Sequence, residues 1–90
     1  MKKILNYRVI VDKEKLEGED VYVTQVPTLG ISDFGPTLEK ALKNTEKMIK
    51  FHLECLIEEE GSVPAPDDTK NIFVANQEIE IASKKRFSFT

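Results

Sequence analysis

The chain has 90 residues, of which 40% are hydrophobic and 32% charged, and its formal net charge at pH 7 is -3. This length suits one domain with a small core, and the composition is typical of a globular chain. The charge excludes the basic excess with which stand-alone nucleic-acid-binding proteins neutralise phosphates, and it suits a positively charged protein partner better. One cysteine, Cys55, forms no internal disulfide. Since neither a signal peptide nor a membrane-spanning apolar run is recognisable, we expect a cytoplasmic protein.

The first third of the chain predicts a three-stranded antiparallel meander. Apolar residues alternate with polar ones from Leu5 to Val11, which is typical of a half-buried strand. A charged loop around Gly18, somewhat longer than the ideal two residues, leads to a second strand over Val21 to Val26. Pro27 ends that strand because it has no N–H to donate. Gly30 to Phe34 leaves room for a short third strand.

The longest regular pattern predicts a helix from Leu38 to about Glu60, because apolar residues recur there at spacings of three and four and form one face that packs on the sheet. Thr37 can cap its first turn, and Gly61 is placed to end it. Residues 61–70, which contain two prolines, are expected to form an extended connector.

The C-terminal segment, residues 71–90, favours further strands. The stretches NIFVA and EIEIA have strand-like composition, and RFSFT alternates through Phe87 and Phe89. We expect at least one of them to return to the sheet. The last one can instead pair with the edge of another chain, which makes Phe87 and Phe89 candidate contacts of a homo-oligomer. The elements together predict an α+β fold in a single domain, 1–90, with its core in residues 4–66 and no separate DNA-binding domain.

Residue types that bind metals or carry catalysis are present, but they lack the arrangement that such chemistry needs. His52 and Cys55 share a helix face, yet a zinc site needs about four ligands, and a thiolate–imidazole pair needs a third, orienting group. Asp12, Glu78 and Glu80 lie on predicted strands, where alternation with apolar residues indicates a solvated sheet face. We therefore expect no catalytic residue and no metal site.

Gly30 and Gly35 flank the approach to the helix N-terminus, a position that attracts phosphate in some folds. Neither the Lys-Ser/Thr pair of a P-loop nor the third glycine of a dinucleotide-binding fingerprint accompanies them. We expect these glycines to shape a turn, and we expect no cofactor.

Glu58, Glu59 and Glu60 place three carboxylates in the last predicted helical turn, where the macrodipole disfavours each by roughly 0.3 to 1 kcal/mol. Solvation of an exposed helix end is one interpretation. The other is an acidic patch for a basic partner, which would include Glu54 and extend towards Asp67 and Asp68.

The ordered motifs Val21-Tyr22-Val23, Pro27-x-Leu29-Gly30, Gly35-x-Thr37-Leu38-Glu39-x-Ala41-Leu42 and, after the long helix, Val63-Pro64-x-Pro66 resemble the HicB-like antitoxins. The resemblance covers about Tyr7 to Pro66. It implies a partial ribonuclease-H-like fold without the nuclease carboxylates, whose turn and helix start are built by Pro27, Leu29, Gly30, Gly35, Thr37 and Ala41. A typical member binds and inhibits HicA, a small basic toxin that cleaves mRNA. The resemblance therefore implies a non-catalytic antitoxin with a HicA-like partner.

The chain departs from the family pattern in three places. Glu19 and Asp20 stand where glycine is common, and the Pro27-to-Gly30 turn is one residue shorter than usual. Many members continue into a DNA-binding domain, whereas Asp67 to Thr90 has strand-like patterns, which argues against direct DNA binding. Two alternatives stay open: an orphan homo-oligomeric interaction module without a toxin partner, and a metal-dependent nuclease that uses Asp12 or Glu80.

Overall fold

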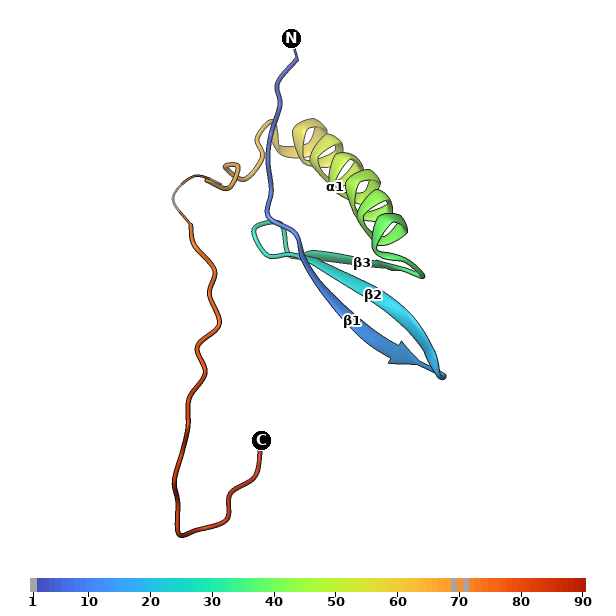
Figure 1. The fold of residues 1–90 in the computed structure, drawn as a ribbon. Coiled ribbons are helices and arrows are strands. Elements are labelled where there is room, and N and C mark those ends of the chain that lie inside the picture. The colour runs from blue at the N-terminus through green and yellow to red at the C-terminus, as the bar shows by residue number, and fades with distance from the viewer. Residues whose placement is uncertain (1, 69, 71) are drawn as a thin grey trace.

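Three strands and one helix make up the fold in the computed structural model, which describes residues 2–68, 70 and 72–90. The elements follow in the order β1 (Ile10–Leu16), β2 (Glu19–Val26), β3 (Ile31–Gly35) and α1 (Leu38–Glu60). The strands form one antiparallel sheet in the order β1-β2-β3, and α1 packs against it (Figure 1). The predicted α+β fold, with its meander and one long helix, is confirmed.

The first strand lies further along the chain than the sequence predicts. A two-residue turn at Glu17 and Gly18 pairs Leu16 directly with Glu19. Both turn residues have positive φ, 53° and 84°, and this combination matches the twist of hairpin strands. The prediction of a longer charged loop is therefore wrong, because Lys13 to Leu16 are strand residues.

The residues before β1 lie against the helix without belonging to the sheet, and the predicted alternation of burial fails at Arg8, which is half-buried like its neighbours Tyr7 and Val9. Leu5, Tyr7 and Val9 are half-buried, and they line a 230 Å³ hollow together with residues of α1 that include Leu42 and Ile49. Of the strand predicted from Leu5 to Val11, only the last two residues belong to β1, and the residues before them lie beside the helix.

Both ends of α1 are capped as the sequence predicts. The Thr37 hydroxyl accepts a hydrogen bond from the Lys40 N–H at 3.1 Å. At the other end Gly61 is left-handed, with φ 70°, and its N–H donates to the carbonyls of Ile57 and Leu56 at 2.9 and 3.2 Å. A glycine is favoured there because it adopts this conformation without a steric penalty.

The helix approaches the sheet most closely where β3 ends. A Cβ built on Gly35 would lie 2.6 Å from the Ala41 backbone nitrogen, and both Gly35 and Ala41 are buried. The side-chain-free backbone of Gly35 is therefore what allows this contact, since real Cβ atoms do not approach backbone so closely.

A buried chain of hydroxyl hydrogen bonds joins the sheet to the helix beside this contact. The hydroxyls of Thr24 and Thr45 lie 2.5 Å apart, and both residues are buried. The Thr24 hydroxyl accepts the Asp33 N–H at 3.1 Å. Two proton arrangements fit the remaining distances: Thr45 donates to the Ala41 carbonyl at 2.7 Å and Thr24 donates to Thr45, or Thr45 donates to Thr24 and Thr24 donates to the Asp33 carbonyl at 3.1 Å. Each hydroxyl then uses its single proton once, and neither is left unsatisfied.

The core is small, and the C-terminal arm, which we define as residues 72–90, lies outside it. Val26 and Ala41 are the hydrophobic residues that the described part of the chain buries fully. In the arm Phe73 and Phe89 are 90% and 96% exposed, and the described residues 72–90 contain neither helix nor strand. The arm extends away from the rest of the molecule (Figure 1). The Cα radius of gyration is 17.9 Å, whereas a compact chain of this length has about 12 Å.

The structure thus contradicts the expectation that a C-terminal stretch returns to the sheet of its own chain. The proline-containing connector instead contacts the segment before β1, since the Asp67 N–H donates to the Asn6 carbonyl at 2.9 Å. Thr69 of the predicted connector and Asn71, the first residue of the predicted C-terminal segment, lie outside the described residues.

Replacement of Gly35 by alanine is expected to lower the free energy of unfolding by about 1 to 3 kcal/mol, because the new methyl group forces α1 away from β3. Urea unfolding followed by circular dichroism measures this change. Gly18→Asn is the matched control, since that glycine has open space around it and asparagine tolerates its positive φ. Equal unfolding midpoints for Gly35→Ala and wild type would contradict the close-contact explanation.

Candidate protein-binding surfaces

The motif residues of the sequence analysis build a turn and a helix start. Pro27 and Leu29 lie in the turn between β2 and β3, where the Gly30 N–H donates to the Val26 carbonyl at 2.9 Å and Gly30 has φ 67°. Gly35, Thr37 and Ala41 form the close contact and the cap described above. These residues position α1 on the sheet, so their contribution to a binding surface is indirect.

The acidic residues at the end of α1 lie beside exposed apolar side chains. Glu54 and Glu58, four residues apart on one helix face, line a 450 Å³ hollow together with Phe51, Cys55 and Ile57. Phe51 is 68% exposed and Ile57 is 55% exposed. Glu59 and Glu60 extend the negative charge, and the last turn of α1 contains no basic residue. We call Phe51, Glu54, Ile57 and Glu58 the acidic–apolar surface.

Phe51 belongs to this surface, although the sequence pattern did not indicate it. Its position falls outside the three-and-four spacing of the apolar face, among charged residues of the opposite side. A large apolar residue out of phase with the buried face of a helix is the signal that could have identified it.

The opposite face of the sheet carries a second exposed apolar surface. Because side chains alternate along a strand, Val21 and Val23 project from the face opposite Thr24. Phe34 is directly paired with Val23 and is 62% exposed. A hollow of 420 Å³ reaches this surface at Glu14, Leu16, Val21, Val23, Ser32 and Phe34, and its lining also includes Lys15 and Asp33 of the other face and Met48 of α1.

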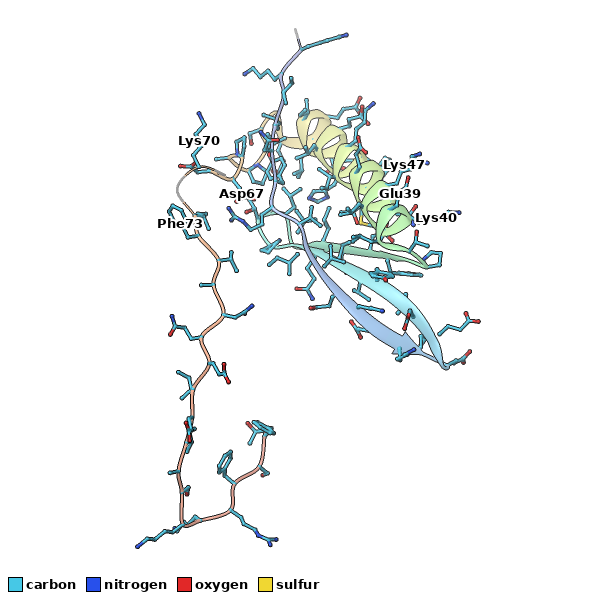
Figure 2. The ribbon with its side chains drawn as sticks, viewed as in Figure 1. Glu39, Lys40, Lys47, Asp67, Lys70 and Phe73 are labelled. Carbon is cyan, nitrogen blue, oxygen red and sulfur yellow. The ribbon has the colours of Figure 1, made fainter. Side chains whose placement is uncertain are left out.

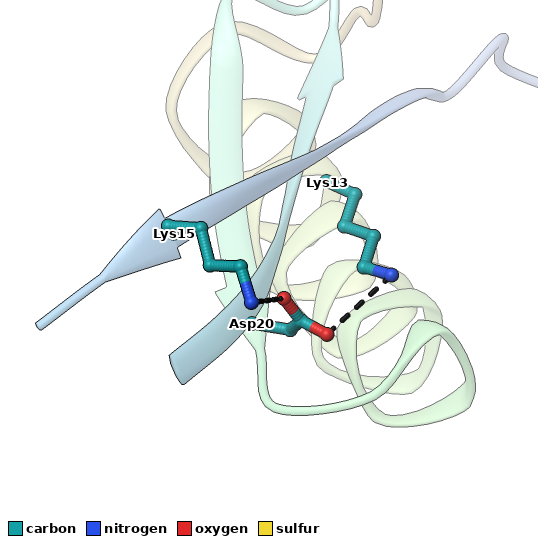
Figure 3. Close-up of polar contacts among 3 residues, drawn as sticks. All are labelled: Lys13, Lys15 and Asp20. Atoms are coloured by element: carbon teal, nitrogen blue, oxygen red, sulfur yellow. Dashed lines mark ion pairs between the residues drawn. The ribbon is translucent and has the colours of Figure 1, made fainter. Parts of the chain in front are cut away.

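The tip of the β1–β2 hairpin carries a cluster of charges that the sequence analysis had placed in a loop. Asp20 lies 2.8 Å from the ammonium group of Lys15 and 3.4 Å from that of Lys13 (Figure 3). The hydrogen bond from Lys15, assisted by Lys13, holds the pKa of Asp20 below its ordinary value. Two cations share one carboxylate, so this face of the hairpin tip carries a surplus positive charge.

Asp67 fastens the connector to two other parts of the chain. One carboxylate oxygen accepts the Arg8 backbone N–H and the other accepts the Thr28 hydroxyl, each at 2.6 Å. The Tyr7 hydroxyl donates to the Pro64 carbonyl at 2.6 Å, and the Arg8 guanidinium donates to the Asp68 carbonyl at 3.2 Å. We call these contacts the Asp67 clasp. It fixes where the arm leaves the folded unit (Figure 2).

The other candidate residues are spread over α1, β1 and the arm. His52 and Cys55 are half-buried in α1, Asp12 is exposed in β1, and Glu78 and Glu80 are exposed in the arm. Among the described residues, no group of three or more His, Cys, Asp or Glu side chains is arranged to bind a metal ion.

Phe87 and Phe89 contact each other near the end of the arm. Their ring centroids are 6.3 Å apart and their planes meet at 86°, which is an edge-to-face pair. Both rings remain largely exposed, so the pair presents apolar surface to solvent.

Comparison of the chain with models of protein families, with characterised proteins and with solved structures found no match. In the part of the chain that the structure describes, no helix combines the length and the apolar character needed to cross a membrane.

The Asp67 clasp is expected to open in acid. Hydrogen bonds from the Arg8 N–H and the Thr28 hydroxyl lower the pKa of Asp67, so the clasp is complete above the ordinary aspartate pKa, about 3.9, and is lost as the pH falls through the lower value of the folded state. The NMR shift of the Arg8 amide proton should follow this titration with a midpoint below about 3.9.

Asp67→Asn should remove this titration from the Arg8 amide, whereas the control Asp68→Asn should leave it in place. A midpoint at or above the ordinary aspartate value would show that the carboxylate is not stabilised by these donors.

Proposed function

We propose that this protein is a non-catalytic, antitoxin-like binding module that covers the active surface of a small basic toxin of the HicA type. The observation that carries the proposal is the acidic–apolar surface at the end of α1, where exposed Phe51 and Ile57 lie beside Glu54 and Glu58. Apolar anchors next to charges complementary to the partner are the usual composition of a protein-binding surface.

The order of the elements adds support. The HicB-like resemblance implies three antiparallel strands followed by a helix, and the chain has that order with its motif residues at the turn and the helix start. A fold alone does not define a function. The kind of partner is therefore inferred from the acidic–apolar surface.

Occlusion is the proposed mechanism. A protein that cleaves mRNA needs a basic surface for the phosphate backbone. Four glutamates in the last two turns of α1 offer carboxylates to the same basic groups, while Phe51 and Ile57 exclude water from the contact. Binding by this protein and by RNA would then be mutually exclusive, and no bond would be made or broken.

Self-association is a second candidate function, favoured by the exposed arm. Phe87 and Phe89 are 64% and 96% exposed, and such residues usually contact a partner. A homo-oligomer would cover them whether or not a toxin partner exists.

The charge-reversal variant Glu54→Lys/Glu58→Lys is expected to weaken binding of the toxin at least about tenfold, which corresponds to ~1.4 kcal/mol. The toxin for this test is a small basic protein encoded beside this gene and co-purified with it, and calorimetry measures its dissociation constant. The variant should fold, because lysines near a helix C-terminus are favoured by the macrodipole.

Glu39→Lys/Glu46→Lys is the matched control, with the same charge change in the first half of α1, where Glu39 lies along the outer side of the helix (Figure 2). Equal weakening by both variants would show a non-specific charge effect. If the two wild-type proteins do not associate at micromolar concentration, the antitoxin function is wrong.

A further inference from the structure

β1 is an open edge of the sheet, whereas the edge at β3 is partly covered. Among the described residues, the sheet order β1-β2-β3 leaves both outer strands without a neighbouring strand on their outer side. At β3 the Asn44 side chain donates to the Phe34 carbonyl at 2.9 Å, and Gly35 lies against the Ala41 backbone. An exposed strand edge is a ready template for another strand, so β1 is the position where one can be added.

The arm contains a segment with the length and the pattern of such a strand. Residues 77–82 match the seven residues of β1 to within one residue. Ile79 and Ile81 alternate with Glu78 and Glu80, and the two isoleucines are 70% and 64% exposed. An alternating segment of this kind becomes stable only when one face is covered and its backbone groups are paired.

We propose that residues 77–82 of one chain add as a strand to the outer edge of β1 in a second copy, and that the exchange is reciprocal. The inference rests on the self-association proposed above as the second candidate function. It specifies the strand that is added, the sheet edge that receives it and the face on which each side chain lies. It is independent of the toxin partner.

The charges on β1 determine on which face of the sheet the glutamates of the added strand lie. Lys13 and Lys15 lie on one face, where both form ion pairs with Asp20 (Figure 3). Asp12 and Glu14 lie on the other face because side chains alternate. Glu78 and Glu80 are attracted by the lysine face and repelled by the carboxylate face. A slip of one residue would reverse the arrangement and place like charges side by side.

The same orientation places the isoleucines on the apolar face of the sheet. Ile79 and Ile81 then join the face that carries Val21, Val23 and Phe34, of which Phe34 is 62% exposed. On β1 itself this face carries Asp12 and Glu14, which lie between the added strand and Val21 and Val23, so the orientation rests on the charges of Lys13 and Lys15.

A second copy is the occupant that the conformation of the arm favours. The Asp67 clasp anchors the start of the arm, and beyond it the arm runs away from its own sheet with its apolar side chains exposed (Figure 1). The radius of gyration of 17.9 Å reflects this extension. In a reciprocal exchange each arm pairs with the β1 edge of the other copy, and one two-fold axis relates the two copies. No arm and no β1 edge is left unpaired, so the assembly closes as a dimer.

The test is a charge exchange between two full-length variants, Lys13→Glu/Lys15→Glu and Glu78→Lys/Glu80→Lys. Each variant alone places like charges at both contacts, so its dimer dissociation constant should rise at least about tenfold in sedimentation equilibrium. An equal mixture of the two variants places opposite charges at both contacts and should restore the wild-type dimer. Restoration in the mixture requires contact between chains, which excludes pairing of each arm with its own β1.

Lys84→Glu/Lys85→Glu is the control variant. It changes the charge of the arm by the same amount outside the proposed strand and should leave the dimer intact.

Wild type that stays monomeric at about 100 µM, well above the micromolar affinities of ordinary complexes, would overturn both the inference and the self-association. A dimer that survives Glu78→Lys/Glu80→Lys, or that is lost in the Lys84 and Lys85 control, would overturn only the proposed strand. Circular dichroism confirms folding, and Glu78→Lys/Glu80→Lys alters only exposed arm residues, so it remains informative if the β1 variant unfolds.

Discussion

The contact between the end of β3 and the first turns of α1 is the constraint on which the rest of the structure depends. Gly35 and Ala41 let two backbones meet without side chains between them, and the Thr24–Thr45 hydroxyl pair ties β2 to the helix beside them. This contact fixes the direction of a helix of 23 residues. The position of the acidic–apolar surface at the far end of α1 follows from it.

Few apolar residues are fully buried in the described part of the chain, and exposed apolar side chains are correspondingly prominent. Val26 and Ala41 are completely covered, whereas Phe34, Phe51 and Ile57 remain more than half exposed on the sheet and the helix. At about 25 cal/mol for each Å² of apolar surface removed from water, covering these side chains is a substantial source of stability for so short a chain. A toxin at the helix end and a second copy at β1 would cover different surfaces, so the two proposals are compatible.

The sequence predicted those features that local chemistry determines. The Thr37 cap, the Gly61 terminus and the short third strand each follow from one or two residues whose backbone preferences are strong. The end of β1 was misplaced because the charged run before Gly18 resembles a loop, and only the pairing of Leu16 with Glu19 shows that this run is part of the strand.

The candidate surfaces were predicted less completely. The glutamates at the helix end are visible in the sequence, but their apolar neighbour Phe51 and the Asp67 clasp depend on which side chains meet in space. The clasp joins residues 59 positions apart, Arg8 and Asp67, a separation that no local pattern reveals. The fate of the arm was also beyond prediction, because the EIEIA pattern indicates a strand without indicating which edge it meets.

The most direct measurement of the central claim, that this fold is completed by a partner at its exposed surfaces, is the thermal unfolding of the full chain over a roughly hundredfold range of protein concentration. If copies stabilise one another, the melting temperature rises with concentration, because association favours the folded state by mass action. A melting temperature that stays constant over this range, with a cooperative transition, would show that the single chain is stable by itself and would contradict the claim for self-association.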